Sequence, residues 1–100
     1  MQAQSDTDTL LITGLDRLTA DNAGRFKTLI TTHLTAAHKI VAVDCSQTRS
    51  VDSFGIGALV AIHRKLGNRN GQVQLRHLQP PVRALLQLLK MDRIFELGGK

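Results

Sequence analysis

The stretch Ile40-Val-Ala-Val43, closed by Asp44, decides the fold. A continuous apolar run this short and this rich in β-branched residues is typical of a strand covered on both sides. Residues 45–52 are polar and show no helical period, so they indicate a connection. We therefore expect 40–43 to be the central strand of a parallel sheet.

Helical patterns flank this strand on both sides. Downstream, a helix is expected from about Ser53 to Leu66, with Leu59 and Ile62 on its core face. Upstream, Thr19 or Asp21 is placed to cap another helix. Its apolar face, with spacings of three and four residues, consists of Ala23, Phe26, Ile30, Leu34 and Ala37.

Further elements extend the alternation of strands and helices. Strands are predicted at 10–13, with 15–18 continuing it beyond a bend, and at 72–76; Ile94–Leu97 indicates a last short strand or half-turn. Pro80-Pro81 opens a helix whose apolar stripe is Val82, Leu85, Leu86 and Leu89. Helices between strands imply right-handed crossovers, so the fold class is α/β with a mostly parallel sheet.

Length and composition fit one domain. The chain has 100 residues, 42% of them hydrophobic, enough for a single core. Residues 1–9 are polar and predict a flexible N-terminal tail, with neither the basic start nor the apolar core of a signal peptide. The domain is then 10–100. The longest apolar stretch, Ala58–Ile62, is too short to cross a membrane.

The net charge of +5 sits in the second half of the chain. Residues 1–48 hold four Lys/Arg and five Asp/Glu, and residues 49–100 hold nine and three. Only three phenylalanines supply aromatic rings, which argues against base stacking on single-stranded nucleic acid. Arg64 and Lys65 point about 100° apart on a helix, so an acidic partner surface is favoured, and a nucleic-acid-binding module stays open on charge alone.

The most informative stretch is Val51-Asp-Ser-Phe-Gly-Ile-Gly57, which places two glycines at the start of a helix. Each internal helical glycine costs roughly 1 kcal/mol relative to alanine, so something other than helix propensity selects them. A helical wheel puts Ser53, Gly57, Val60 and Arg64 within about 40° of one direction, with Ile56 beside them. We interpret this face as a docking surface; the alternative is that Ser53 is an N-cap and Val60 a stray exposed valine.

These segments resemble the STAS domain, and more narrowly the bacterial anti-sigma factor antagonists. The resemblance covers roughly residues 10–97, and it implies a single STAS-like domain with helices packed mainly on one side of the sheet. The segments that carry it are Val41–Ser46, Val51–Leu59, Gly71–Leu75, Val82–Leu89 and Asp92–Phe95.

The resemblance implies a phospho-switch in the cytoplasm. The family's serine at the position of Ser53 is phosphorylated by an anti-sigma factor that is also a serine kinase, and the unphosphorylated form captures that partner. Asp44 and Asp52 match positions near the switch, where they either take part in it or cap turns. The expected partner-binding residues are Asp44, Asp52, Phe54, Gly55, Ile56, Gly57, Val60 and Arg64.

Three departures from the family pattern stand out. Phe54 occupies a position where the family often has a second Ser or Thr, which bears on partner choice. Only about nine residues, 10–18, are available for the usual two-strand entry unless the polar tail contributes. The chain also ends at Lys100, where relatives often continue into a final helix.

Other functions have weaker support. A serine hydrolase needs glycine where Val51 stands, and a dinucleotide loop needs glycine where Val60 stands. Four histidines lack the i, i+4 spacing for shared metal ligation and are expected at the surface; Cys45 is expected to be a small buried residue.

We expect no catalytic residue, metal or cofactor, no membrane insertion, and at most a weak homodimer. A second STAS function stays open, the docking subunit of a lipid-transport ATPase complex.

Overall fold

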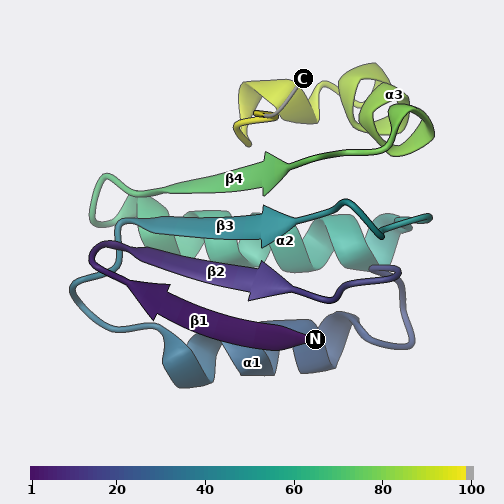
Figure 1. Cartoon of the computed structure of the whole chain (residues 1–100). Helices are drawn as coiled ribbons and strands as arrows, with labels where there is room; N and C mark the ends of the chain where they lie inside the picture. Colours follow the sequence, from purple (N-terminus) through teal and green to yellow (C-terminus); the bar gives the residue numbers. More distant parts are fainter. Residues whose placement is uncertain (99–100) are drawn as a thin grey trace.

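The computed structural model describes residues 1–98, and its centre is a four-stranded sheet (Figure 1). In space, as in the chain, the strands follow the order β1 (Gln2–Asp6), β2 (Thr9–Thr13), β3 (Ile40–Asp44) and β4 (Gln72–Arg76). β1 runs antiparallel to β2, whereas β2, β3 and β4 are parallel to one another. The α/β class and the mostly parallel sheet are therefore confirmed, with the predicted central strand as β3.

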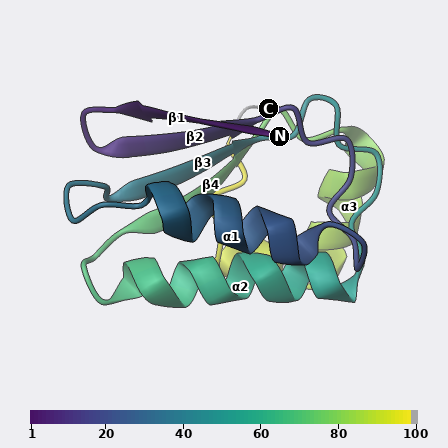
Figure 2. The ribbon, with the colours of Figure 1, turned by 90° about the horizontal axis from the view of Figure 1, so that it is seen from below.

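Two long helices connect the parallel strands and lie together on one face of the sheet (Figure 2). They are α1 (Ala23–His33) and α2 (Ser53–Gly67); α3 (Pro80–Leu88) and the 3-10 turn η1 (Met91–Arg93) follow β4. Within residues 1–98, no helix is both long and apolar enough to cross a bilayer.

The core fills the space between the sheet and these helices. Because side chains alternate along a strand, one set of sheet residues meets the helices, and in β3 this set is Val41 and Val43. The core includes Leu10, Ile12, Val41, Val43, Val73 and Leu75 from the sheet and Phe26, Ile30, Leu59, Ile62 and Leu66 from α1 and α2.

The opposite face of β3 has no helix over it in the described part of the chain, as expected for helices packed mainly on one side. Val41, Ala42 and Val43 are nevertheless all buried, so the prediction of a strand covered on both sides is confirmed. Ala42 is fully buried on the face without a helix. It lies in register between Leu11 of β2 and Gln74 of β4, and a methyl side chain is small enough for such neighbours to cover.

The prediction of a flexible tail over residues 1–9 is wrong for residues 2–6, which form β1. This strand pairs with β2 from Gln2 opposite Thr13 to Asp6 opposite Thr9. Its side chains are exposed apart from Ala3, which packs against the core. An open edge strand favours polar and charged side chains, which is why its sequence resembles a tail. The polar residues thus supply the first strand of the two-strand entry.

Several predicted boundaries also shift. α1 ends at His33, because Leu34 adopts an extended conformation, so Ala37 lies beyond the helix. Residues 15–18 do not continue β2: Gly14 turns the chain with φ +71°, and of these residues only Leu18 pairs, through an isolated bridge to Val51.

The C-terminal elements follow the prediction in part. In α3, Val82 and Leu86 are buried, whereas Leu89 is 44% exposed just after the helix. Instead of a strand, residues 94–97 contribute one bridge, in which the backbone of Glu96 bonds to Leu75 and Val73 at 2.8 and 2.9 Å. This bridge covers part of the outer edge of β4.

Candidate functional site

The candidate site is the start of α2, where the chain arrives from β3. Asp52, in an extended conformation, is the N-cap, and Ser53 is the first helical residue. The alternative in which Ser53 itself caps the helix is therefore wrong. Ser53 is exposed, and its hydroxyl makes no hydrogen bond within residues 1–98. A serine in this state is open to modification.

Asp52 ties the helix start to the loop before α1. One carboxylate oxygen, Oδ1, accepts from the backbone N–H of Gly55 at 2.9 Å, as an N-cap does. The other, Oδ2, accepts from the N–H of Ala20 at 3.0 Å, and the N–H of Asp52 donates to the carbonyl oxygen of Leu18 at 3.2 Å. The residue beside Ser53 is thus held from two directions.

Gly55 is required by the fold, because the helix start lies directly on the 18–20 backbone. A β-carbon at this position would sit 2.0 Å from the carbonyl oxygen of Leu18 and 2.8 Å from its carbonyl carbon. Both are backbone atoms, which cannot rotate away as the end of a side chain can. Only glycine fits without displacing one segment.

Gly57 has the opposite environment. It is exposed, and a β-carbon there would meet nothing within 4 Å. The fold itself would accept alanine at this position.

The outward face of α2 carries the apolar character that the sequence predicts. Phe54 is 65% exposed, Ile56 and Val60 are half-buried against the core, and Arg64 is exposed. The opposite face is fully buried and consists of Gly55, Ala58, Leu59, Ile62 and Leu66. Phe54, Gly57 and Val60 therefore lie on a surface that the chain itself leaves open.

Asp44 lies apart from this helix start. Its Oδ1 accepts from the N–H of Ser46 at 3.0 Å, so it caps the turn after β3. Within the described residues it makes no hydrogen bond to 51–57. The neighbouring Cys45 is buried, as predicted, and burial raises the pKa of its thiol to about 12. It has the character of a packing residue rather than a reactive thiol.

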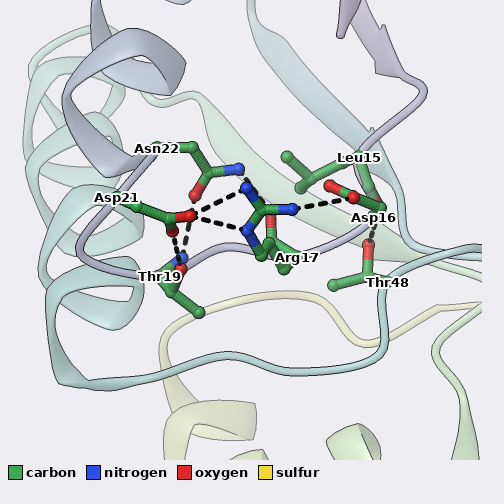
Figure 3. Close-up of polar contacts among 7 residues, drawn as sticks. All are labelled: Leu15, Asp16, Arg17, Thr19, Asp21, Asn22 and Thr48. Carbon is green, nitrogen blue, oxygen red and sulfur yellow. Dashed lines mark hydrogen bonds and ion pairs between the residues drawn. The ribbon is translucent and has the colours of Figure 1, made fainter.

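The loop before α1 holds a polar network that sequence reasoning missed (Figure 3). The side chain of Asn22 accepts from the N–H of Thr19 at 2.9 Å and donates to the carbonyl oxygen of Arg17 at 2.7 Å. The α1 N-cap is Asn22, without a side-chain cap bond, so the predicted capping by Thr19 or Asp21 is wrong. Thr48, a buried residue of the connection between β3 and α2, also contacts this loop: its hydroxyl donates to the carbonyl oxygen of Leu15 at 2.6 Å.

Arg17 forms the exposed part of this network. It pairs with Asp16 at 2.9 Å and with Asp21 at 2.7 Å. Hydrogen bonds from Arg17 and then from Thr19 lower the pKa of Asp21 to about 2. No sequence pattern marks these contacts, apart from the four-residue spacing of Arg17 and Asp21.

Nothing in the described residues forms a metal site, since no three His, Cys, Asp or Glu side chains gather suitably. The expectation of surface histidines is wrong for His38, which is 2% exposed. Its Nδ1 accepts from the N–H of Thr35 at 3.0 Å, and its Nε2 lies 2.6 Å from the hydroxyl oxygen of Ser5. It joins β1 to the loop before β3.

Several basic side chains of the second half have internal roles. Arg69 donates to the carbonyl oxygens of Thr35 and His38 at 2.6 and 3.2 Å. Arg76 donates to the side chain of Gln74 at 2.8 Å, and Arg83 to the carbonyl oxygen of Leu97 at 3.3 Å. These three arginines bond to other residues of the described chain, so they are not free cations of the kind that binds nucleic acid.

Comparisons with known proteins give the same fold. A family model described as "Mlab, STAS domain" matches residues 1–97. A putative anti-sigma factor antagonist from Thermotoga maritima, TM1081, is 23% identical over 94% of this chain and 81% of its own, with a TM-score of 0.84. No curated protein matches the chain.

Two further solved structures extend this picture. The Bacillus cell fate determinant SpoIIAA, in its phosphorylated form, is 18% identical over 99% of this chain and 91% of its own, with a TM-score of 0.73. A sulfate transporter family protein from Wolinella succinogenes is 16% identical over 89% of this chain and 71% of its own, with a TM-score of 0.68. At these identities the likeness to the solved structures establishes the fold alone.

Proposed function

The chain belongs to the STAS domain family, and we propose that it is an anti-sigma factor antagonist, a cytoplasmic binding protein rather than an enzyme. The observation that carries the proposal is Ser53, whose exposed, unbonded hydroxyl stands at a rigidly held helix start. Two of the similar structures are described as anti-sigma factor antagonists, TM1081 and SpoIIAA, which supports this function over others known for the fold.

In the unphosphorylated state, the outward face of α2 binds an anti-sigma factor that is also a serine kinase. Phe54 is the largest exposed apolar group of α2 and borders this face on one side; Val60 lies about 120° and Ile56 about 160° around the helix from it, at the other side of the face. Fully burying an exposed side chain such as Phe54 gives roughly 1.5–3 kcal/mol, whereas Ile56 and Val60 are already half-buried and would add less. Asp52 and Gly55 fix the backbone that presents Ser53, and Asp44 shapes the connection before it.

Phosphorylation then reverses the binding. The kinase transfers the γ-phosphoryl group of ATP to Oγ of Ser53, and ADP and the hydroxyl proton leave. The phosphate adds about −1.5 to −2 charges at a helix N-terminus, where the helix dipole tolerates them. The fold is therefore retained; SpoIIAA has structures in both the unphosphorylated and the phosphorylated form.

The added charge acts instead on the interface. Asp52 already places a carboxylate next to Ser53, and Arg64, about 16 Å along the helix, is too distant to neutralise a phosphate. The partner would have to bury a dianion beside Phe54. Like charges or unpaired charges at an interface cost several kcal/mol, so phosphorylation releases the partner.

The test compares three baits in a lysate of the source organism: wild type, Ser53→Asp, and the matched control Ser53→Ala. We expect wild type and Ser53→Ala to retain the same kinase-domain protein, and Ser53→Asp to retain at least tenfold less. The purified kinase with ATP should phosphorylate the wild type at Ser53, as seen by mass spectrometry. Equal retention by Ser53→Asp, or no transfer to Ser53, would contradict the proposal.

A second candidate is the docking subunit of a lipid-transport ATPase complex. The 65% exposure of Phe54 favours it, because a large apolar group suits a permanent interface. In that case the retained protein would be an ATPase subunit and Ser53 would carry no phosphate. The same baits therefore separate the two functions.

A further inference from the structure

Gly57 has no role within the chain that requires a glycine. It is the fifth residue of α2, inside a helix of 15 residues, where glycine is unfavourable relative to alanine. A β-carbon would meet nothing within 4 Å. Within residues 1–98, nothing in the fold thus requires a glycine at position 57, a property that it shares with Gly24 and Gly67.

The position of Gly57 on the helix indicates a function for the glycine. Around the helix axis it lies between Phe54 and Val60, about 60° from each. Phe54 is mostly exposed and Val60 half-buried. The missing side chain leaves the α2 backbone bare in the middle of the apolar surface, where another chain can approach it closely.

We propose that Gly57 is the contact point at which the partner packs against the α2 backbone, so that this glycine determines partner specificity. The inference rests on the proposed function and assigns to Gly57 a role distinct from that of Ser53. Ser53 controls whether the partner binds, and Gly57 controls which shape of partner fits.

Charge complementarity defines the occupant. Residues 53–67 contain no Asp or Glu, and Arg64 and Lys65 are exposed towards the end of α2. A second copy of the chain docked through this same helix would bring identical cations to it. The occupant is therefore a different protein, with an apolar side chain over Gly57 and acidic groups facing the end of α2.

The experiment compares Gly57→Ala with the matched control Gly24→Ala. Gly24 is also exposed and helical, with nothing within 4 Å of its β-carbon position, but it belongs to α1. The probe is the purified kinase-domain protein that the wild-type bait retains, and its affinity is measured by calorimetry. Thermal unfolding of each free variant is measured in parallel.

We expect both variants to raise Tm by about 2 to 8 °C, because a helical Gly→Ala change is stabilising where nothing clashes. Gly57→Ala should weaken binding at least tenfold, and Gly24→Ala should leave it unchanged. Gaining stability while losing affinity is an outcome that a purely structural role of Gly57 would not give.

The possible failures are separable. Wild-type affinity in Gly57→Ala, with Ser53→Asp still impaired, overturns the role of Gly57 and leaves the proposed function intact. A lower Tm in Gly57→Ala overturns it too, because the glycine would then serve the fold. Wild-type affinity in both Ser53→Asp and Gly57→Ala, or no kinase retained by any bait, overturns the proposed function and this inference with it.

Discussion

Gly55 and Gly57 lie two residues apart in α2 but face different surroundings. Gly55 points inward, where a β-carbon would sit 2.0 Å from a backbone oxygen, and Gly57 points outward, where a β-carbon would meet nothing. The inward side of the helix start is fixed by contacts to the 18–20 backbone. The outward side is open, apolar and next to a free hydroxyl. One short motif thus combines a structural requirement with a binding surface, and residue type alone does not tell them apart.

The largest loss of stability is expected when Gly55, on the inward side of the helix start, is replaced by alanine. The new β-carbon would force α2 away from Leu18, and overpacking of this kind typically costs 1–3 kcal/mol. We expect the free energy of unfolding to fall by about 3 kcal/mol, at the upper end of that range because the obstacle is backbone. Urea denaturation measures it, with Gly57→Ala as the control of opposite sign. A loss below about 0.5 kcal/mol would mean that the helix start shifts freely, and the contrast between the two glycines would disappear.

Replacing Asp52 by alanine should have the next largest effect. The change leaves the N–H groups of Gly55 and Ala20 without their acceptors. Loss of an N-cap costs about 0.5–2 kcal/mol, and we expect about 1–2 kcal/mol here because two donors are affected. Hydrogen exchange of both amides should accelerate.

The matched control is Asp52→Asn. Its amide retains one acceptor oxygen, so it can serve only one of the two N–H groups and should lose less stability than Asp52→Ala. Losses below about 0.5 kcal/mol in both variants would show that the carboxylate does not connect the two segments, and that Gly55 alone fixes the helix start.

How far the sequence predicts the molecule depends on whether a feature is local. β3 and the buried face of α2 follow from apolar spacing, because burial imposes a period on neighbouring residues. The edge strand β1 does not, because exposed side chains on an edge carry no apolar pattern. The roles of Asp52, Gly55 and Thr48 depend on partners more than 30 residues away. The motif Val51–Gly57 could be singled out from its glycines, but only the contact with Leu18 shows which glycine serves the fold.

The smallest effect on stability is expected at Asp21, an exposed residue of the loop before α1, which the start of α2 contacts. Hydrogen bonds from Arg17 and Thr19 lower its pKa from an ordinary 3.8 to about 2. Since the folded state has the lower pKa, the charged form adds stability above pH 3.8, and this contribution is lost as the pH falls towards 2. The side chain is exposed, so solvent screens the pair and the contribution is small.

Asp21→Asn tests this with little change of shape, since the amide oxygen can still accept one hydrogen bond. We expect the urea midpoint of the wild type to exceed that of Asp21→Asn slightly at pH 7, and the two to converge near pH 2. A difference that persists unchanged at pH 2 would show that shape rather than charge matters at Asp21. A difference as large as that of Asp52→Ala would place the main anchor of the helix start in the exposed Arg17 network. The contrast between a fixed inward side and an open outward side would then be wrong. Solvent-exposed ion pairs, rather than the contacts of Gly55 and Asp52, would hold the start of α2 in place.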